Sequence, residues 1–354
     1  TYYENIVIDE KLTVIGNGSG NTTVNGTLAN HRINIYFTDE VSLSGLNIEA
    51  GGNSTETTCG IVIYRSNYAN INDVVVNKGH TGICVSGGTY NKISSSLIKD
   101  NIAYGISLRE DGGVTADYTT IENTTIKNNE YGIYATQGGD YSTIYNNTIS
   151  NNGMGINIDR ASSITISYNT IKDNDGGSNT AGLWLQDGSH HNIRYNNLSN
   201  NRNGIHTWYI GEEEGPNALT LIGNIINDNE DDGMVIGRDS KNWYLWNNTI
   251  KENGGYDLHF PSTGSIGHNS VNTEFDTIYV NSGSSLTIRE YFVLDINDAS
   301  GNNMSGIDIK VMENDVQKYA TSYFGGSDAK TDSYGTIATF LIDYKIYNGS
   351  STPT

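Results

Sequence analysis

The chain has 354 residues, and its 36% hydrophobic and 10% aromatic content is too high for a disordered protein. Glycine (41) far outnumbers proline (3), which together with the many Asn, Thr, Ser, Ile and Tyr residues indicates β-structure with tight turns. A formal net charge of -20 argues against nucleic acid or an anionic membrane as a partner, because both repel an acidic surface. No apolar run approaches the ~18 residues of a membrane span, so none is expected.

The first part of the chain contains short apolar runs without a helical period. Residues 6–8, 12–14 and 33–61 alternate in the manner of β-strands and predict one or two leading coils. The chain opens inside such a coil, so we expect it to be a segment of a longer protein. We also expect a preceding segment or a neighbouring molecule to cover the hydrophobic end.

A six-residue segment then recurs eight times, about every 25 residues, with an aliphatic residue third and asparagine sixth. Seven of the eight segments are followed by a glycine that precedes Ile, Leu or Met. The recurrence of the same residue types at the same phase predicts stacked coils, in which like residues lie on like residues ~4.8 Å apart. The segments begin at Asn72, Ser96, Thr124, Asn147, Asn169, Asn196, Asn224 and Asn248.

Each fixed position of this repeat has an expected role. The aliphatic residues form interior columns, and the sixth-position asparagines form hydrogen-bonded ladders that tolerate a left-handed corner. The glycine allows a positive φ or a close approach of the backbone. Extra residues in the longer units predict loops at 110–117, 137–141, 175–180 and 209–217. The predicted fold is all-β: a right-handed parallel β-helix of about ten coils over residues 1–273.

The repeat loses its phase after residue 273. Residues 274–348 contain alternating runs broken by the turn motifs at 297–301 and 331–335, which predict a β-sandwich of about seven strands. The spacing LDINDASGNNMSGIDIKV … TDSYGTIATF resembles the immunoglobulin-like modules of bacterial and archaeal surface proteins, which serve as spacers, caps or adhesive joints. Residues 349–354 are a linker-like tail.

One unit, NNTISNNGMGINIDRASSITISYNTIKDN at residues 146–174, resembles the parallel β-helix repeat of carbohydrate-binding and sugar-hydrolase proteins. Within that group the chain is most similar to periplasmic copper-maturation β-helix proteins and to cell-surface β-helix proteins of archaea. The resemblance covers residues 1–270 and implies the fold more than an activity, because the group mixes lyases, hydrolases, epimerases and non-enzymatic surface proteins.

The chain carries no complete catalytic signature of the enzymes in this group. Asp231-Asp232 and Gly79-His80-Thr81 match two fragments of a polygalacturonase-like set, but they lie six coils apart, and the other fragments are absent. This favours a non-enzymatic extracellular protein: a subunit of a surface layer, adhesin or filament that contacts copies of itself or other surface proteins, head to tail. The alternative is a polysaccharide-binding or polysaccharide-degrading protein, a lyase, glycoside hydrolase or epimerase.

The residue two after each repeat glycine is expected to point outward. Tyr134, Trp184 and His206 occupy this stripe, and with Trp208 and Tyr209 they predict a platform on which a sugar chain stacks. The same aromatic residues could instead pack on one another, lie under loops or line a subunit contact.

Two acidic turns offer clustered oxygen atoms that suit Ca²⁺. They contain Asp173 with Asp175, and Asp231 with Asp232. Neither turn matches a full EF-hand loop, and no other cofactor is expected.

The two cysteines lie in neighbouring units, Cys59 one residue before its glycine and Cys84 two residues after the next. With the glycines in register, strict alternation places them on opposite sides and about 11 Å apart, beyond the reach of a disulfide. We therefore predict two unlinked thiols.

Ten N-x-[ST] sequons predict an exported glycoprotein, extracellular or at the cell surface. The candidate asparagines are Asn17, Asn21, Asn25, Asn53, Asn123, Asn146, Asn197, Asn247, Asn303 and Asn348.

Overall fold

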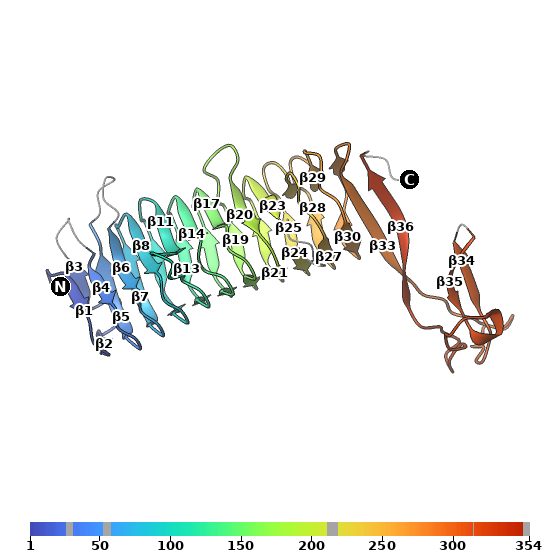
Figure 1. The fold of residues 1–354 in the computed structure, drawn as a ribbon, viewed down its shortest axis with the longest axis horizontal. Coiled ribbons are helices and arrows are strands. Elements are labelled where there is room, and N and C mark those ends of the chain that lie inside the picture. The colour runs from blue at the N-terminus through green and yellow to red at the C-terminus, as the bar shows by residue number, and fades with distance from the viewer. Residues whose placement is uncertain (26–30, 52–57, 211–218, 314, 350–354) are drawn as a thin grey trace.

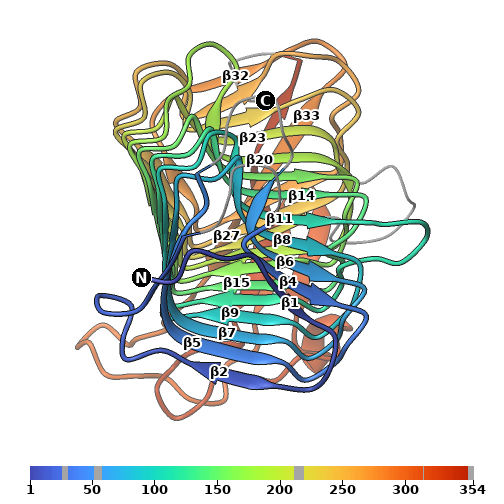
Figure 2. The same ribbon diagram turned by 90° about the vertical axis from the view of Figure 1, so that its left-hand side faces the viewer.

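The computed structural model describes residues 1–25, 31–51, 58–210, 219–313 and 315–349. It shows a long rod of stacked coils, with a small lobe at the far end that is connected by two long strands (Figure 1). Seen from the N-terminal end, the strands of successive coils line up behind one another (Figure 2). The architecture is all-β, as predicted, and the chain is a parallel β-solenoid.

The coils stack into one sheet of 12 parallel strands, called sheet one here, and two further rows of a second sheet. Sheet one consists, among the described residues, of β1 (Ile6–Ile8), β4 (Ile33–Tyr36), β6 (Cys59–Tyr64), β8 (Thr81–Ser86), β11 (Tyr104–Arg109), β14 (Tyr131–Thr136), β17 (Met154–Asp159), β20 (Ala181–Gly188), β23 (Asn203–Ile210), β26 (Met234–Ile236), β29 (Leu258–Phe260) and β32 (Ile278–Val280).

The two rows of the second sheet share their early long strands β5 (Ser42–Glu49) and β7 (Asn70–Asn77) and then separate. Row two continues β2 (Thr13–Ile15) with β9 (Lys92–Ser94), β12 (Thr120–Glu122), β15 (Thr143–Tyr145), β18 (Thr165–Ser167), β21 (His191–Arg194), β24 (Leu219–Ile222), β27 (Trp243–Trp246), β30 (His268–Val271) and β33 (Ser285–Phe292). Row three continues β3 (Thr23–Asn25) with β10 (Leu97–Lys99), β13 (Thr125–Lys127), β16 (Thr148–Ser150), β19 (Thr170–Lys172), β22 (Asn197–Ser199), β25 (Ile225–Asn227), β28 (Thr249–Lys251) and β31 (Glu274–Phe275).

The aliphatic residues of the repeat form the interior column that the sequence predicts. Ile126 pairs with Ile149, Ile149 with Ile171, and Ile171 with Leu198, each one coil further along the rod. All four side chains are fully buried and belong to one continuous hydrophobic core. Complete burial of such a side chain stabilises the fold by about 1.5–3 kcal/mol, so the column is a main source of stability.

The sixth-position asparagines form the predicted ladder. Nδ2 of Asn129 donates to Oδ1 of Asn152 at 3.0 Å, and Nδ2 of Asn152 donates to Oδ1 of Asn174 at the same distance. The left-handed corner residue is the one before the ladder, for example Asn128 with φ 56°. The side chain of the ladder asparagine therefore points inward and forms hydrogen bonds with buried amide groups. Leaving such buried groups unpaired would cost free energy.

A second asparagine ladder, which the sequence analysis did not predict, runs through the first position of the repeat. Nδ2 of Asn147 donates to Oδ1 of Asn169, and Nδ2 of Asn169 donates to Oδ1 of Asn196, both at 3.0 Å. Both ladders are buried, so the polar corners of each coil are tied to the next coil.

The repeat glycines do not have a positive φ. They are needed because the backbone at these positions packs closely against interior side chains. A Cβ on Gly132 would lie 2.8 Å from Cγ2 of Ile149 in the interior. The glycine and the following isoleucine therefore both face inward, which breaks the alternation of the strand at this point.

This break in alternation makes the cysteine prediction wrong. Cys59 and Cys84 form a disulfide, with their Cα atoms 6.1 Å apart. The register is the expected one, with Cys84 opposite Val62. Because Gly60 and Ile61 both point inward, Cys59 and Val62 emerge on the same outer face, where they cluster with Cys84.

The solenoid continues past residue 273. In β32 and β33 the parallel ladders persist, and β33 also pairs antiparallel with the long strand β36 (Phe340–Asn348), which covers the end of the rod (Figure 1). The lobe between them contains a hairpin of β34 (Lys310–Glu313) and β35 (Val316–Ala320) and a short 3₁₀ helix, Ser322–Phe324. The structure therefore does not confirm the predicted immunoglobulin-like sandwich at 274–348, because alternation in sequence predicts strands but not their partners.

Within the described part of the chain, no helix has the length and apolar character needed to cross a membrane.

Candidate functional site

The outward stripe two residues after each glycine lies on the outer face of sheet one, in the predicted register. Tyr134 pairs with Asn157, Asn157 with Trp184, and Trp184 with His206. The Trp184 and His206 rings stack with their centroids 3.9 Å apart and an interplanar angle of 24°. This stack is the centre of the predicted platform.

Tyr134 does not join that stack. Its ring stacks on Tyr104, with centroids 4.9 Å apart, and lies 5.6 Å from Tyr131. Tyr104 precedes its glycine by one residue, and Tyr134 follows the glycine of the next coil by two. Cys59 and Cys84 occupy the same two positions in their own neighbouring coils. The predicted platform is thus divided into two groups, separated by Asn157.

Trp208 and Tyr209 extend the Trp184–His206 group toward the neighbouring loop. The His206 and Trp208 rings lie 6.3 Å apart, and the Trp208 and Tyr209 rings meet edge to face at 5.9 Å. Tyr209 has φ 55° and begins the predicted loop 209–217, of which residues 211–217 lie outside the described residues.

A cleft of about 450 Å³ opens beside this aromatic group. The described residues that line it come from the turn before β20 and from the three following coils, those of β23, β26 and β29. They include Asn179, Arg202, Trp208, Asp232 and His259. The cleft therefore combines an aromatic side with a charged side, both on the outer face of sheet one.

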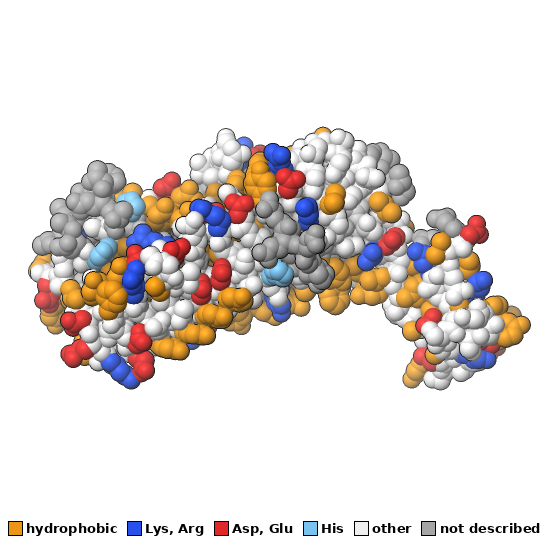
Figure 3. Space-filling view, viewed as in Figure 1, with side chains coloured by type: hydrophobic (Ala, Val, Ile, Leu, Met, Phe, Trp, Pro, Cys, Tyr) orange, Lys and Arg blue, Asp and Glu red, His pale blue; other side chains and the backbone are white. Residues whose placement is uncertain are grey.

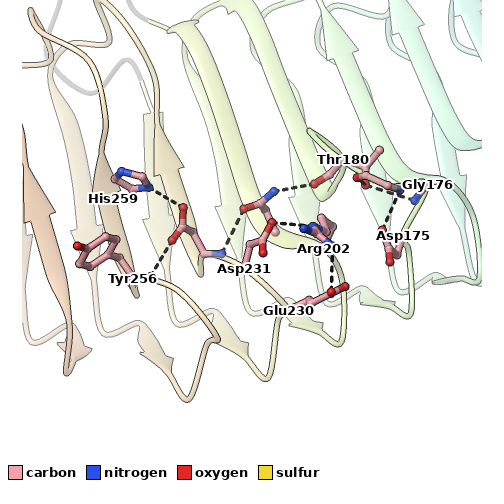
Figure 4. A network of polar contacts seen from close by, with 11 residues as sticks. Asp175, Gly176, Thr180, Arg202, Glu230, Asp231, Tyr256 and His259 are labelled. Carbon is pink, nitrogen blue, oxygen red and sulfur yellow. Dashed lines mark hydrogen bonds and ion pairs between the residues drawn. The ribbon is translucent and has the colours of Figure 1, made fainter.

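The charged side is built on the residues that directly precede β23 and β26. Nε of Arg202 lies 2.6 Å from Oδ2 of Asp231, and Nη1 of Arg202 lies 2.9 Å from Oε1 of Glu230 (Figure 4). The side chain of Asp231 is 45% exposed and that of Arg202 is 27% exposed, so solvent screens these ion pairs and they add little to stability. Their main effect is to hold the Arg202 guanidinium in one orientation.

A second carboxylate in the cleft holds a histidine. Oδ2 of Asp232 lies 2.6 Å from Nδ1 of His259, and Oδ1 of Asp232 accepts a hydrogen bond of 2.7 Å from the backbone N–H of Tyr256 (Figure 4). The two side chains are only 14% and 24% exposed. Because Asp232 accepts from Nδ1–H, the imidazole of His259 is oriented and its Nε2 is the nitrogen left for other contacts.

Polar contacts continue from this pair across three coils. The backbone N–H of Asp232 donates to Oδ1 of Asn203 at 3.2 Å, and Nδ2 of Asn203 donates to the backbone carbonyl of Thr180 at 2.9 Å. The floor of the cleft is thus a hydrogen-bonded chain that runs along the axis of the rod (Figure 4).

His206 differs from His259 in its surroundings. Its ring is 7% exposed beneath Trp184, and burial lowers its pKa to about 4, with the nearby Asp232 carboxylate acting in the opposite direction. His206 is therefore neutral near pH 7 and contributes a flat ring, not a charge, to the cleft.

Each of the predicted calcium ligands contacts another partner. Asp173 pairs with the neighbouring Lys172 at 3.2 Å, and Oδ1 of Asp175 accepts from the backbone N–H of Gly177 at 2.9 Å. Asp231 and Asp232 bind the cationic and imidazole partners named above. No group of three or more His, Cys, Asp or Glu residues that could hold a metal occurs in the part of the chain that the structure describes. The prediction of a Ca²⁺ site gains no support from these contacts.

Sequence analysis missed His259 and Arg202 as members of the site. A signal for His259 was present, because Asp257 occupies the glycine position of the degraded eighth unit and His259 follows it by two. His259 accordingly pairs with Val235 in the outward stripe. Arg202 carried no such signal, since residues directly before a strand vary in direction.

Exposed tyrosines form a separate ladder at a left-handed corner of the coils. The rings of Tyr68, Tyr90, Tyr118 and Tyr141 stack in this order at 5.3, 4.8 and 5.0 Å. Hydrophobic side chains, tyrosine included, gather in a band along the rod (Figure 3). Both faces of Tyr90 and Tyr118 are covered by neighbouring rings, so this ladder stiffens the corner and its inner rings offer no open face to a ligand.

Eight of the ten sequon asparagines have exposed side chains, Asn25 is half-buried, and Asn53 lies outside the described residues. The exposed candidates are Asn17, Asn21, Asn123, Asn146, Asn197, Asn247, Asn303 and Asn348.

Fold and register together define a right-handed parallel β-helix repeat protein. A family model described as a right-handed β-helix region matches residues 59–213. No protein of curated function is detectably similar in sequence.

Several solved structures are similar in fold. The catalytic domain of Agl-KA is 15% identical with a TM-score of 0.56, over 80% of this chain and 60% of that one. A GH136 lacto-N-biosidase from Eubacterium ramulus is 12% identical with a TM-score of 0.54, over 78% and 59% of the two chains. The A-module of the mannuronan C-5 epimerase AlgE6 from Azotobacter vinelandii is 12% identical with a TM-score of 0.48, over 78% and 73%. This chain thus spans about 60% of the first two structures, and the likeness is one of fold.

Proposed function

We propose that this chain is a polysaccharide-acting β-helix protein that binds a glycan in the cleft on the outer face of sheet one. His259, oriented by Asp232, is the proposed acid–base group. This is the alternative that the sequence analysis held beside a purely structural role.

The observation that carries the proposal is the meeting of two features in one cleft of about 450 Å³. One is the aromatic side formed by Trp208 and His206, and the other is the Asp232–His259 pair at 2.6 Å. Sugar rings present C–H faces that pack on aromatic rings, and their hydroxyl groups need polar partners of defined direction. A cleft that crosses the strands of successive coils, along the axis of the rod, suits a chain of several sugar units.

The chemistry follows from the state of the imidazole. With Nδ1–H donated to Asp232, Nε2 of His259 can take a proton from a sugar carbon or hydroxyl, or return one to a leaving glycosidic oxygen. The Arg202–Asp231 pair lies on the same side and positions a guanidinium and a second carboxylate beside the reacting unit. Lyase, epimerase and hydrolase chemistry all need such a proton transfer.

The comparisons support the proposal at the level of fold. The lacto-N-biosidase from Eubacterium ramulus is named as an enzyme acting on a glycan, and it shares the β-helix. The proposal for this chain rests on the residues of the cleft.

The location we propose is outside the cell or on its surface. The Cys59–Cys84 disulfide supports it, because disulfides persist in oxidising compartments and are rare in the cytosol. The exposed sequon asparagines are consistent with the same location.

The test is to incubate the purified chain with a panel of neutral, amino-sugar and acidic polysaccharides. New reducing ends report hydrolysis, ultraviolet absorbance reports the unsaturated product of a lyase, and NMR of the recovered polymer reports epimerisation. We expect one polysaccharide class to be modified or bound, with loss of the effect in His259→Ala. A panel that is neither bound nor modified would contradict the proposal.

A second candidate is the structural module of a surface layer, adhesin or filament that contacts copies of itself or other surface proteins. The two buried asparagine ladders and the continuous core favour it, because they make a stiff rod suited to a spacer. Self-assembly of the purified chain at micromolar concentration, measured by light scattering, tests this candidate.

A further inference from the structure

We infer that the glycan of this cleft bears no carboxylate or sulfate groups and that amino sugars bind most strongly. This inference rests on the proposed function and adds its substrate class. It follows from the balance of charge in the cleft.

Among the described residues that line it, the cleft offers an acidic sugar no cation without a carboxylate partner. Arg202 is the only Lys or Arg among the described residues that line it. Its guanidinium is already held by two carboxylates, Asp231 at 2.6 Å and Glu230 at 2.9 Å. A sugar carboxylate is recognised most strongly by a guanidinium or ammonium whose charge is not already neutralised, and here two of the five guanidinium donors are bonded to carboxylates that neutralise its charge.

The sum of formal charges at the cleft is negative. Among the described lining residues, Asp231 and Asp232 carry two negative charges against the single positive charge of Arg202, which leaves -1. Glu230 does not line the cleft but pairs with Arg202 at 2.9 Å and adds a further negative charge beside it. His206 adds nothing, because burial lowers its pKa to about 4 and keeps the ring neutral.

An acidic sugar would therefore lose its hydration against like charges, which is unfavourable. The chain as a whole has a formal net charge of -20, which also slows the approach of a polyanion. A sugar ammonium or hydroxyl group, by contrast, can donate to the carboxylate of Asp231, whose side chain is 45% exposed. Hydrogen bonds from a cationic donor to a carboxylate are about twice as strong as neutral ones.

The aromatic side of the cleft is compatible with the same substrate class. Trp208 offers a half-buried ring to the apolar face of a sugar, an interaction that does not depend on acidic substituents. Stacking would thus bind neutral and amino sugars alike, and the carboxylates would distinguish between them.

The experiment compares binding of the whole chain to four probes by calorimetry: chitosan oligosaccharides, a neutral β-glucan, polygalacturonate and alginate, each at low and moderate salt. We expect the chitosan oligosaccharides to bind most tightly, the neutral glucan more weakly, and both polyuronates at least tenfold more weakly than the glucan. Added salt should weaken the chitosan interaction, because it screens the attraction to the carboxylates.

Two variants distinguish an effect of the cleft carboxylate from an effect of the net charge of the chain. Asp231→Asn should lower chitosan affinity about tenfold and leave neutral-glucan affinity within a factor of two. Glu10→Gln, an exposed residue far from the cleft in sequence and in the first coil, makes the same change in net charge and should leave both affinities unchanged.

The outcomes distinguish this inference from the function on which it rests. If a polyuronate binds most tightly and loses affinity in Trp208→Ala, the glycan function stands and the substrate class is overturned. If no probe binds, both fail. If Glu10→Gln weakens chitosan binding as much as Asp231→Asn, the attraction is not specific to the cleft and the inference is withdrawn.

Discussion

Nδ1 of His259 lies 2.6 Å from Oδ2 of Asp232, although 27 residues of chain separate them. The contact forms because the two residues occupy adjacent coils, Asp232 just before β26 and His259 within β29. Stacked coils bring residues about one repeat apart into contact. A polar pair can therefore form between two adjacent coils, without contacts between distant parts of the chain.

The Asp232–His259 pair makes a first prediction about activity. His259→Ala and Asp232→Asn should each lower the rate on the active polysaccharide by about 10²–10⁴-fold, the usual contribution of a positioned acid–base group. The pH–rate profile should change in Asp232→Asn, because the imidazole loses the partner that orients it. Full activity of His259→Ala would assign the chemistry to another group. Circular dichroism controls for folding, since Asp232 also accepts the Tyr256 amide.

The Trp184–His206 stack predicts a measurable titration. Burial lowers the pKa of His206 to about 4, so Trp184→Ala, which uncovers the ring, should raise this pKa toward the ordinary value of 6.5. NMR titration of the imidazole checks the shift. Tyr134→Ala is the matched control, because Tyr134 stacks on Tyr104 and not on His206. An unchanged pKa in Trp184→Ala would show that other groups bury the ring.

The buried asparagine ladder predicts a large loss of stability from a small change. Asn152→Ala removes the acceptor for the backbone N–H and the Nδ2 of Asn129 and one of the two donors to Oδ1 of Asn174, which keeps the backbone N–H of residue 152. The buried N–H of Asn129 left without a partner costs about 1–3 kcal/mol and each other lost hydrogen bond about 1 kcal/mol, so we expect a loss of about 3 kcal/mol. Urea denaturation measures it. Asn197→Ala, at an exposed strand position, should change stability by less than about 0.5 kcal/mol.

The disulfide predicts the chemical state of the two cysteines. The intact protein should show no iodoacetamide-reactive thiol and a mass 2 Da below that of the reduced chain, as expected for loss of two hydrogens. Cys59 and Cys84 are 25 residues apart, so by chain entropy the bond stabilises the fold by about 3.5 kcal/mol. The Cys59→Ser variant should therefore melt at a lower temperature. Labelling of two thiols in the folded, untreated protein would contradict the bond.

Buried histidines predict that stability falls as the solution is acidified. Burial lowers the pKa of His191 to about 4 and that of His268 to about 3. As pH falls from 6.5 the unfolded chain binds these protons before the folded chain does. Stability is therefore unaffected above pH 6.5 and is lost between pH 6.5 and about 4 for His191 and about 3 for His268, by up to about 1.4 kcal/mol per pH unit for each histidine.

A single substitution tests that pH dependence. His191 pairs with Leu219 in the next coil, so His191→Leu should fit the same interior column. The variant should show a flatter dependence of unfolding free energy on pH between 6.5 and 4. An unchanged slope would mean that the loss of stability comes from other groups, the carboxylates included.

The sequence by itself determined the solenoid, its register and its interior. Ile126 and Ile149 could be assigned to the interior column, and Asn152 to the asparagine ladder, because the same residue types recur at the same position of each repeat. Stacking of coils explains this recurrence, since it places equivalent residues on top of one another. The outward direction of Trp184 and His206 followed from the same phase, once the glycine fixed the start of each strand.

Only the tertiary structure decided which outward residues meet. The alternation of inward and outward side chains fails at each repeat glycine, because the glycine and the next residue both face inward. Strict alternation would place Cys59 and Cys84 on opposite sides of the sheet. The break puts them on the same side, where they form a disulfide. The site was decided in the same way, since Arg202 with Asp231, and Asp232 with His259, are contacts between coils of unequal length. Phase along the chain fixes the direction of a side chain, but loop length and bending at the corners fix its neighbour.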